Sequence, residues 1–379
     1  MSTRTLTRVL TIGLLTLGAA ALPGQALAQG RRKTGKTEKT EKGGKSGKSG
    51  KTDHPHATLI LERGREIAEV EIREFKFDKL KYRTKGSRRD DDIKGEKVVE
   101  VRLLDPPPLF ASGVSRVRAG LYKRAVESFD KTLDQVEGDD DWVWFYATYW
   151  RGQAKLLAGD AAGAATDFQA VVDKDKEHFL VPDALYGLGQ AFTASKDSGK
   201  AQAAFEKLAE GFGSLWGCKA KLGLGDTLLE SDPEKARAAY NLAGARAGSD
   251  KDLRRAAEVG EGKCMIARKQ WDQAADKFER IITEPGLAPE VAAMAWVGKG
   301  DCRYEQAKAR NDDKDLFKQA LIAYQTCVVR FAGVPESYPK ALFRSAELYE
   351  KLGQAKLAEF QKKELKSRCP NSPWTEKIK

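Results

Sequence analysis

The feature that most constrains this chain is a residue pair that recurs at a nearly regular interval. An alanine is followed four positions later by an aromatic residue in six successive units: Ala125 and Phe129, Ala164 and Phe168, Ala201 and Phe205, Ala236 and Tyr240, Ala274 and Phe278, and Ala320 and Tyr324. The alanines are 39, 37, 35, 38 and 46 residues apart, and a seventh, Ala358, follows 38 residues later with Lys362 in the aromatic position. Such a period indicates a stack of repeated structural units.

A second marker, a small residue, precedes each alanine, by twelve positions in five of the seven units. These markers are Gly113, Gly152, Gly189, Gly225, Gly262, Gly300 and Ala346. A small residue on one helix and an alanine on the next let the two axes approach closely, and the aromatic residue one turn later lies on the same face. Helical hairpins of this kind cannot bury their apolar faces alone, so they stack into a solenoid.

The pattern resembles the tetratricopeptide-repeat family. One clear unit is Leu188-Gly189-x-x-Phe192 with Ala201 and Phe205, and another runs from Gly262 through Trp271, Ala274 and Phe278 to Pro285. The resemblance starts at about Leu109 and implies a mainly α fold, an α-solenoid of about seven helical hairpins over residues 109–372. The sixth unit departs from the family norm by extra residues around 310–315, and the ending at 368–373 looks like that of exported, envelope-associated members.

A strand-rich segment precedes the repeats. Apolar and polar residues alternate from residue 57 to 104, for example at Leu59 and Leu61 and again at Val70 and Ile72. Four or five short strands in this space predict a small antiparallel β module over residues 55–105, with a loose resemblance to SH3-like or Sm-like barrels. The acidic run 90–92 in its charged loop suits either a hard cation or plain solvation.

The first 28 residues have the three parts of a secretory signal peptide. Arg4 and Arg8 form a basic start, residues 9–22 are apolar but too short to span a bilayer comfortably, and Ala26-Leu27-Ala28 is a small-x-small cleavage site. We therefore expect export to the periplasm or beyond the cell. The alternative is an uncleaved anchor.

Residues 29–54 are predicted to be a disordered basic linker. The span 31–52 holds nine Lys or Arg and two Glu and no apolar residue, so it cannot bury enough surface to fold. It contributes seven of the eleven formal positive charges, and only two remain for residues 53–379. The folded part therefore lacks the charge excess of a nucleic-acid-binding protein. The linker suits either an anionic envelope polymer or lipid as a partner, or a solvated spacer.

Partner-binding residues are predicted on the first helix of each hairpin, which lines the inner groove in this family. Three positions before the small marker stand Phe110, Tyr149, Tyr186 and Leu222, and one position after it stand Gln153, Gln190 and Asp226. Tyr146 belongs to an aromatic-rich run at 142–150. An apolar stripe beside hydrogen-bonding groups suits an extended or helical peptide. The alternative is that the stripe is core.

No catalytic or cofactor chemistry is expected. The three histidines, His54, His56 and His178, have no zinc-like cluster around them, and we expect His178 at the surface. The five cysteines are an odd number and suit buried free thiols on helices more than a disulfide framework. Two functions stay open: an exported, non-catalytic protein-binding scaffold, or a structural envelope component that is tethered by its linker and used in assembly or secretion.

Overall fold

The computed structural model describes residues 54–136, 142–370 and 372–378. The predicted signal peptide and the predicted linker as far as Asp53 lie outside these residues. Within the described part, none of the helices combines the length and the hydropathy that crossing a membrane requires.

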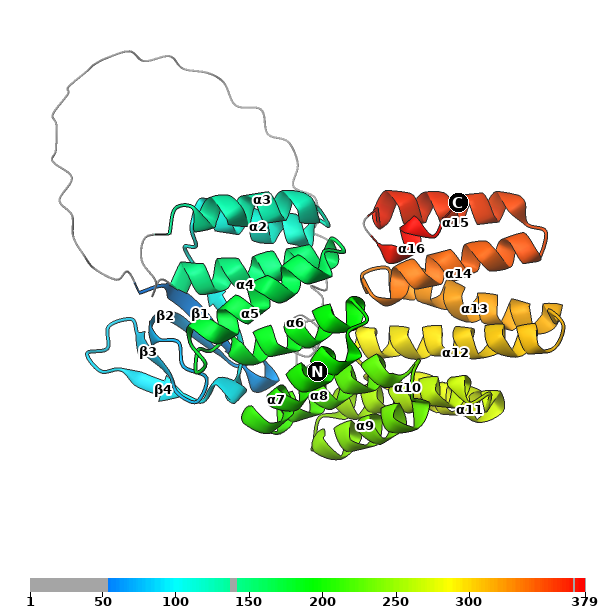
Figure 1. Cartoon of the computed structure of the whole chain (residues 1–379), viewed down its shortest axis with the longest axis horizontal. Helices are drawn as coiled ribbons and strands as arrows, with labels where there is room; N and C mark the ends of the chain where they lie inside the picture. Colours follow the sequence, from blue (N-terminus) through cyan, green and yellow to red (C-terminus); the bar gives the residue numbers. More distant parts are fainter. Residues whose placement is uncertain (1–53, 137–141, 371, 379) are drawn as a thin grey trace, which may run out of the picture.

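A five-stranded antiparallel sheet forms the beginning of the described chain (Figure 1). The strands are β1 (His56–Leu61), β2 (Glu66–Glu74), β3 (Leu80–Thr84), β4 (Asp91–Ile93) and β5 (Val98–Leu103), with 3-10 turns at Glu62–Gly64 and Gly95–Lys97. Their order is β4-β3-β2-β1-β5, so β5 returns to pair with β1. The prediction of four or five short strands is confirmed. In the acidic run, Asp92 forms an ion pair with Lys79 and Asp90 with Arg83.

Seven helical hairpins follow, as the repeat predicts. They are α2 (Pro108–Arg118) with α3 (Tyr122–Leu133), α4 (Trp142–Leu157) with α5 (Ala161–Lys174), α6 (Val181–Ala194) with α7 (Ser198–Gly211), α8 (Gly213–Leu228) with α9 (Pro233–Arg246), α10 (Lys251–Ala267) with α11 (Trp271–Ile282), α12 (Pro289–Ala309) with α13 (Lys314–Arg330), and α14 (Ser337–Lys351) with α15 (Ala355–Arg368). The short helix α16 (Pro373–Glu376) follows. The extra length predicted for the sixth unit is shared by both of its helices, since α12 has 21 residues and α13 has 17.

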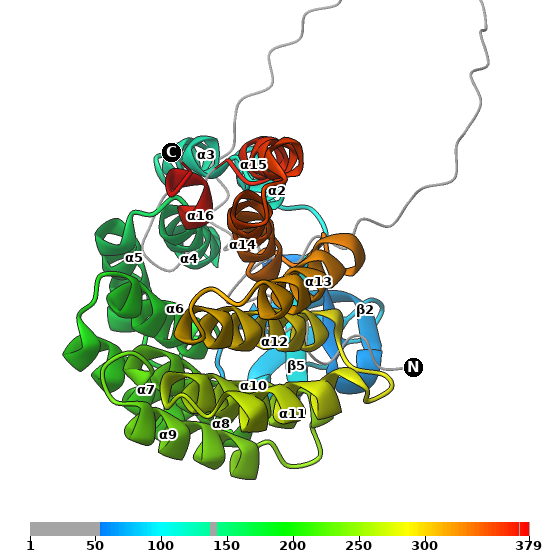
Figure 2. The same ribbon diagram turned by 90° about the vertical axis from the view of Figure 1, so that its right-hand side faces the viewer.

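The hairpins wind into a superhelix (Figures 1 and 2). Each first helix contacts the first helix of the next hairpin, from α2 through α4, α6, α8, α10 and α12 to α14. The second helices lie outside this layer, and the last hairpin returns to the level of the first (Figure 2). We call the surface made by the first helices the inner face. Several second helices begin at an aspartate N-cap, such as Asp160, Asp197 and Asp232, whose side chain accepts a backbone N–H.

The recurring aromatic ring is the element that joins one hairpin to the next. Phe205 on α7 lies between Gly189 of its own hairpin and Gly223 of the following one, and Phe278 lies in the same way between Gly262 and Gly298. Both rings are fully buried. A Cβ atom built at Gly223 or Gly298 would stand 2.5 Å from the facing ring, which no side chain can do without displacing its neighbour.

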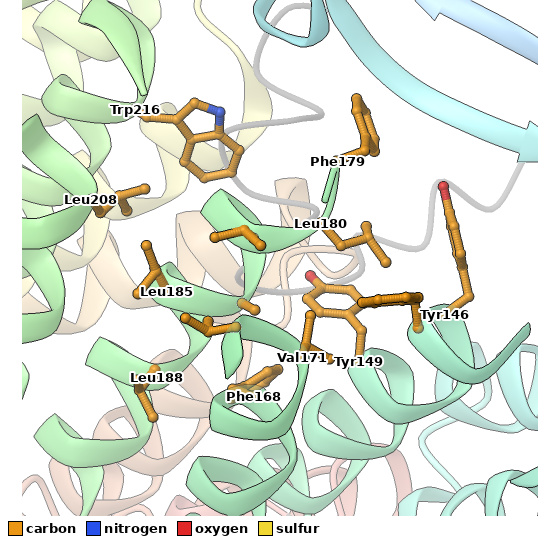
Figure 3. Packing of buried hydrophobic residues seen from close by; sticks show 14 of the residues in the cluster. Tyr146, Tyr149, Phe168, Val171, Phe179, Leu180, Leu185, Leu188, Leu208 and Trp216 are labelled. Carbon is orange, nitrogen blue, oxygen red and sulfur yellow. The ribbon is translucent and has the colours of Figure 1, made fainter. Parts of the chain in front are cut away.

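The sheet packs against the second, third and fourth hairpins. Phe75, after β2, contacts Tyr146 with ring centroids 5.7 Å apart, and Phe77 contacts Phe212 at 5.2 Å. The loop between α5 and α6 joins the sheet through its backbone, because Phe77 N–H donates to the carbonyl of Glu177 and Phe179 N–H donates to that of Phe75. Figure 3 shows Phe179 and Tyr146 on the side of the core that faces the strands. The sheet and the first four hairpins therefore share one core.

The expectation that His178 lies at the surface was wrong. The side chain is 4% exposed, and its ring stacks on Phe145 at 3.8 Å and on Phe75 at 5.7 Å. Burial lowers the pKa of His178 to about 3, so the ring is neutral and its Nδ1 accepts the N–H of Leu180. The sequence shows a charged stretch before His178, but the pairing of this loop with the sheet decides its burial.

The cysteines lie as free thiols on or beside helices. Cys218, Cys264, Cys302 and Cys327 are buried, and Cys369 is half-buried. Burial raises the pKa of Cys218 and Cys327 to about 12, which keeps both thiols protonated and weakly nucleophilic.

We predict that Gly298→Ala destabilises the chain by about 1–3 kcal/mol, because the new methyl group overlaps the Phe278 ring. Gly244→Ala is the matched control, since a Cβ there meets the Cβ of Ala257 at an ordinary 3.6 Å. The control gains helix propensity and should be neutral or stabilised by about 1 kcal/mol. Urea unfolding followed by circular dichroism measures both. Equal effects of the two substitutions would contradict the ring contact.

Candidate protein-binding face

Four of the eight predicted contact residues lie accessible on two neighbouring first helices. Tyr186 and Gln190 on α6 and Leu222 on α8 are half-buried, and Asp226 on α8 is exposed. The two helices are in contact, and the ring of Tyr186 packs on Phe205 with ring centroids 5.8 Å apart. The Oε1 atom of Gln190 is buried and accepts no hydrogen bond from the described part of the chain. The structure thus places a half-buried aromatic ring and a half-buried aliphatic side chain on adjoining helices that also carry the exposed Asp226.

The other four predicted residues are buried between helices. Phe110 packs on Phe129 with ring centroids 5.8 Å apart, and Tyr149 packs on Phe168 at 5.9 Å (Figure 3). Gln153 donates to the hydroxyl of Tyr149 at 3.1 Å, and Tyr146 faces the sheet. Each of these four side chains is only 4–5% exposed. We therefore assign them to packing, the alternative that the sequence left open.

The carboxylate of Asp226 on α8 contacts side chains of α9 and α10. Its Oδ1 atom accepts a hydrogen bond from the Tyr240 hydroxyl on α9 at 2.7 Å and another from Lys263 Nζ on α10 at 2.9 Å. Two hairpins later the arrangement recurs, because Asp301 accepts from the Tyr324 hydroxyl at 2.7 Å and pairs with Lys340. The sequence carried the signal for this contact, since tyrosine replaces phenylalanine only in the two units where aspartate follows the glycine marker.

Glu336 is the residue of this face that the sequence analysis missed. It is the N-cap residue of α14, and its negative charge is one of the influences that raise the pKa of Tyr186 on α6. Glu336 is an exposed residue, but the protein around it displaces part of its hydration shell. This partial desolvation, together with the negative charges of Asp226 and Glu290, raises the pKa of Glu336 to about 7, while Lys263 opposes the shift.

The comparisons with known proteins agree with this architecture. A family model described as "Tetratricopeptide repeat" matches residues 110–178 and 149–214. Over residues 110–214, the helical hairpins from α2 to α7 match tetratricopeptide repeats. A search of the curated proteins found no match. The resemblance stated from the sequence is therefore confirmed, and the fold is that of a protein-interaction scaffold.

The solved structures that resemble the chain include the following three. A tetratricopeptide repeat protein from Parabacteroides merdae is 12% identical, with 71% of this chain and 96% of that chain covered and a TM-score of 0.47. A Rap protein complexed with competence and sporulation factor is 13% identical, with 70% and 76% covered and a TM-score of 0.46. Pseudomonas aeruginosa pilF is 19% identical, with 64% and 98% covered and a TM-score of 0.37.

The raised pKa of Glu336 predicts a pH-dependent stability. The unfolded chain releases this proton near pH 4.5, the ordinary value for glutamate, whereas the folded chain keeps it up to about pH 7. The folding contribution of Glu336 is thus fully present below pH 4.5 and is lost as the pH rises through about 7. Glu336→Gln should match the original chain at pH 4.5 and exceed its stability at pH 8.

Urea unfolding at both pH values tests this prediction. The exposed Glu210→Gln on α7 serves as the control, because it removes a carboxylate from the outside of the superhelix. A difference between Glu336→Gln and the original chain that stays constant from pH 4.5 to pH 8 would show that the surroundings of Glu336 do not favour its protonated form.

Proposed function

We propose that this protein is an exported, non-catalytic scaffold that holds a segment of a partner protein on its inner face. The contact residues of the proposal are Tyr186, Gln190, Leu222 and Asp226. A partner segment in extended or helical form would lay apolar side chains on Tyr186 and Leu222 and polar groups near Gln190 and Asp226.

The observation that carries the proposal is the partial solvent exposure of these side chains, which lie on adjoining first helices. Beside the fully buried rings of the stack, Tyr186 and Leu222 remain partly accessible next to the exposed Asp226. Aromatic residues are enriched at the centre of protein interfaces. Export rests on the arrangement of residues 1–28 described above.

In-cell photo-crosslinking tests the proposed face directly. A photoreactive amino acid at position 222 on α8 should give one discrete protein adduct, and the same residue at position 242 on α9 should give none. Leu242 is the matched control because it is a leucine on a second helix and is 51% exposed. N-terminal sequencing of the crosslinked chain should begin at Gln29, which checks export in the same sample.

Tyr186→Ala should weaken partner binding about thirtyfold and lower the adduct yield accordingly, since truncating an aromatic anchor at an interface commonly has an effect of about 2 kcal/mol. Phe360→Ala removes an equally large ring that is 56% exposed on α15 and should leave the yield unchanged. Circular dichroism checks that both variants are folded. Equal yields from positions 222 and 242, or no effect of Tyr186→Ala in a folded chain, would contradict the proposal.

A further inference from the structure

The two edges of the sheet differ in length and in charge. One edge is β4, which has three residues, two of them the acidic Asp91 and Asp92. The other edge is β5, which has six residues, four of them valine or leucine. Short edge strands and charged side chains hinder the pairing of a sheet edge with another chain. The β4 edge is thus protected, whereas β5 has a bulge opposite Leu61 and then a regular run to Leu103.

The outer backbone groups of this regular run are available for pairing. The N–H of Leu104 donates to the carbonyl of His56, and along an antiparallel pair such bonds recur at every second residue. The backbone groups of Arg102 therefore point toward β1, and those of Val101 and Leu103 point away from it. Within the described residues, no other strand lies beyond β5 and no group bonds the outer N–H and C=O groups of Val101 and Leu103.

The apolar side of the sheet is open along the same strand. Ala57 and Leu59 of β1 are fully buried. Their partners on β5, Leu103 and Val101, are only half-buried, although both pack against the shared core. A strand added beyond β5 would therefore cover apolar side chains as well as form backbone hydrogen bonds.

The sequence of β5 is complementary to itself when it is reversed about Val101. In an antiparallel pair centred on this residue, the outward groups of Val101 in the two copies bond each other. Glu100 then lies opposite the second copy's Arg102, and Leu103 lies opposite its Val99. Opposite charges that face each other across two strands are favourable. A pair centred on Arg102 would instead place two arginines opposite each other.

The charged side chains of β5 are accessible to a second copy. Within one chain, Arg102 and Glu100 form an ion pair at 3.3 Å, with 53% and 43% of their side chains exposed. The basic span 31–52 of the chain itself is a poor partner for this edge, because it holds no apolar residue that could cover Val101 and Leu103. The pattern of β5 therefore favours a second β5 as its occupant.

We propose that β5 is a dimerisation strand, through which two copies of this chain pair antiparallel about Val101 and join their sheets edge to edge. The contact is isologous, since each copy contributes the same residues. A dimer would also present two inner faces, so that a partner with two binding segments is held more strongly than by one copy. This consequence rests on the proposed function, whereas the dimer contact does not.

Sedimentation equilibrium of the purified full chain over a dilution series tests the dimer. The mass should rise from that of one chain to that of two as the concentration increases. Hydrogen exchange measured by mass spectrometry locates the contact, because peptides that cover β5 should gain protection at high concentration. Peptides that cover β4, the protected edge, should show no change.

Charge exchange tests the register. Glu100→Lys places a lysine opposite Arg102 of the second copy, and Arg102→Glu places two glutamates opposite each other, so each variant should weaken dimerisation about tenfold. An equal mixture of the two variants should recover the dimer, because each position then faces the opposite charge again. Glu210→Lys, at an exposed site on α7, changes the net charge as Glu100→Lys does and should leave dimerisation unchanged.

Val101→Pro tests the backbone pairing. Proline removes the outward N–H of residue 101, which the bonds between β5 and β1 do not use, and edge strands tolerate it there. This variant should stay monomeric, and circular dichroism should show that it is folded.

The inference is overturned if the full chain stays monomeric at every concentration, if its dimer survives Val101→Pro, or if the mixed charge variants fail to pair. A dimer without a partner adduct at position 222 would refute only the proposed function. A partner adduct from a chain that stays monomeric would refute only the dimer contact.

Discussion

The structure depends on one contact, an aromatic ring enclosed between the glycine backbones of two successive first helices. A glycine exposes its backbone, so a ring from the second helix can lie flat against it and fill the space that side chains would occupy. Phe168, Phe205, Tyr240 and Phe278 each contact a glycine of their own hairpin and a glycine of the next. The same ring therefore closes one repeat and attaches the following one. Because this geometry recurs, its small rotation per hairpin accumulates into the superhelix.

Much of the solenoid could be predicted from the sequence because the repeated residues contact segments that are close in the chain. The small marker, the alanine and the ring lie where two helices of one hairpin, or of neighbouring hairpins, cross. The second glycine of each contact, such as Gly223 or Gly298, is also visible two positions before the next marker, as in Gly223-Leu224-Gly225. The strand alternation of residues 57–104 likewise reports a local property, the half-buried face of each strand.

The sequence reasoning failed where distant segments meet. His178 became a buried ring because the loop after α5 pairs with the sheet about a hundred residues earlier. Phe110, Tyr146, Tyr149 and Gln153 follow the periodicity of the inner face, but the contacts that bury them come from neighbouring helices and the sheet. The charge of Glu336 acts on α6 only because the superhelix brings the last hairpin back, and no spacing along the chain encodes that return. Residues whose role depends on curvature therefore need the three-dimensional structure.

A double-mutant cycle tests most directly whether the ring sets the spacing between repeats. Phe278 is replaced by leucine, Gly298 by alanine, and then both together, and the free energy of unfolding of each chain is measured in urea. If the ring contact is the constraint, the alanine is strongly destabilising next to phenylalanine and nearly neutral next to leucine, which leaves room for the methyl group. If the alanine has the same effect in both backgrounds, the ring and the glycine are not coupled, and the account of how these repeats join is wrong.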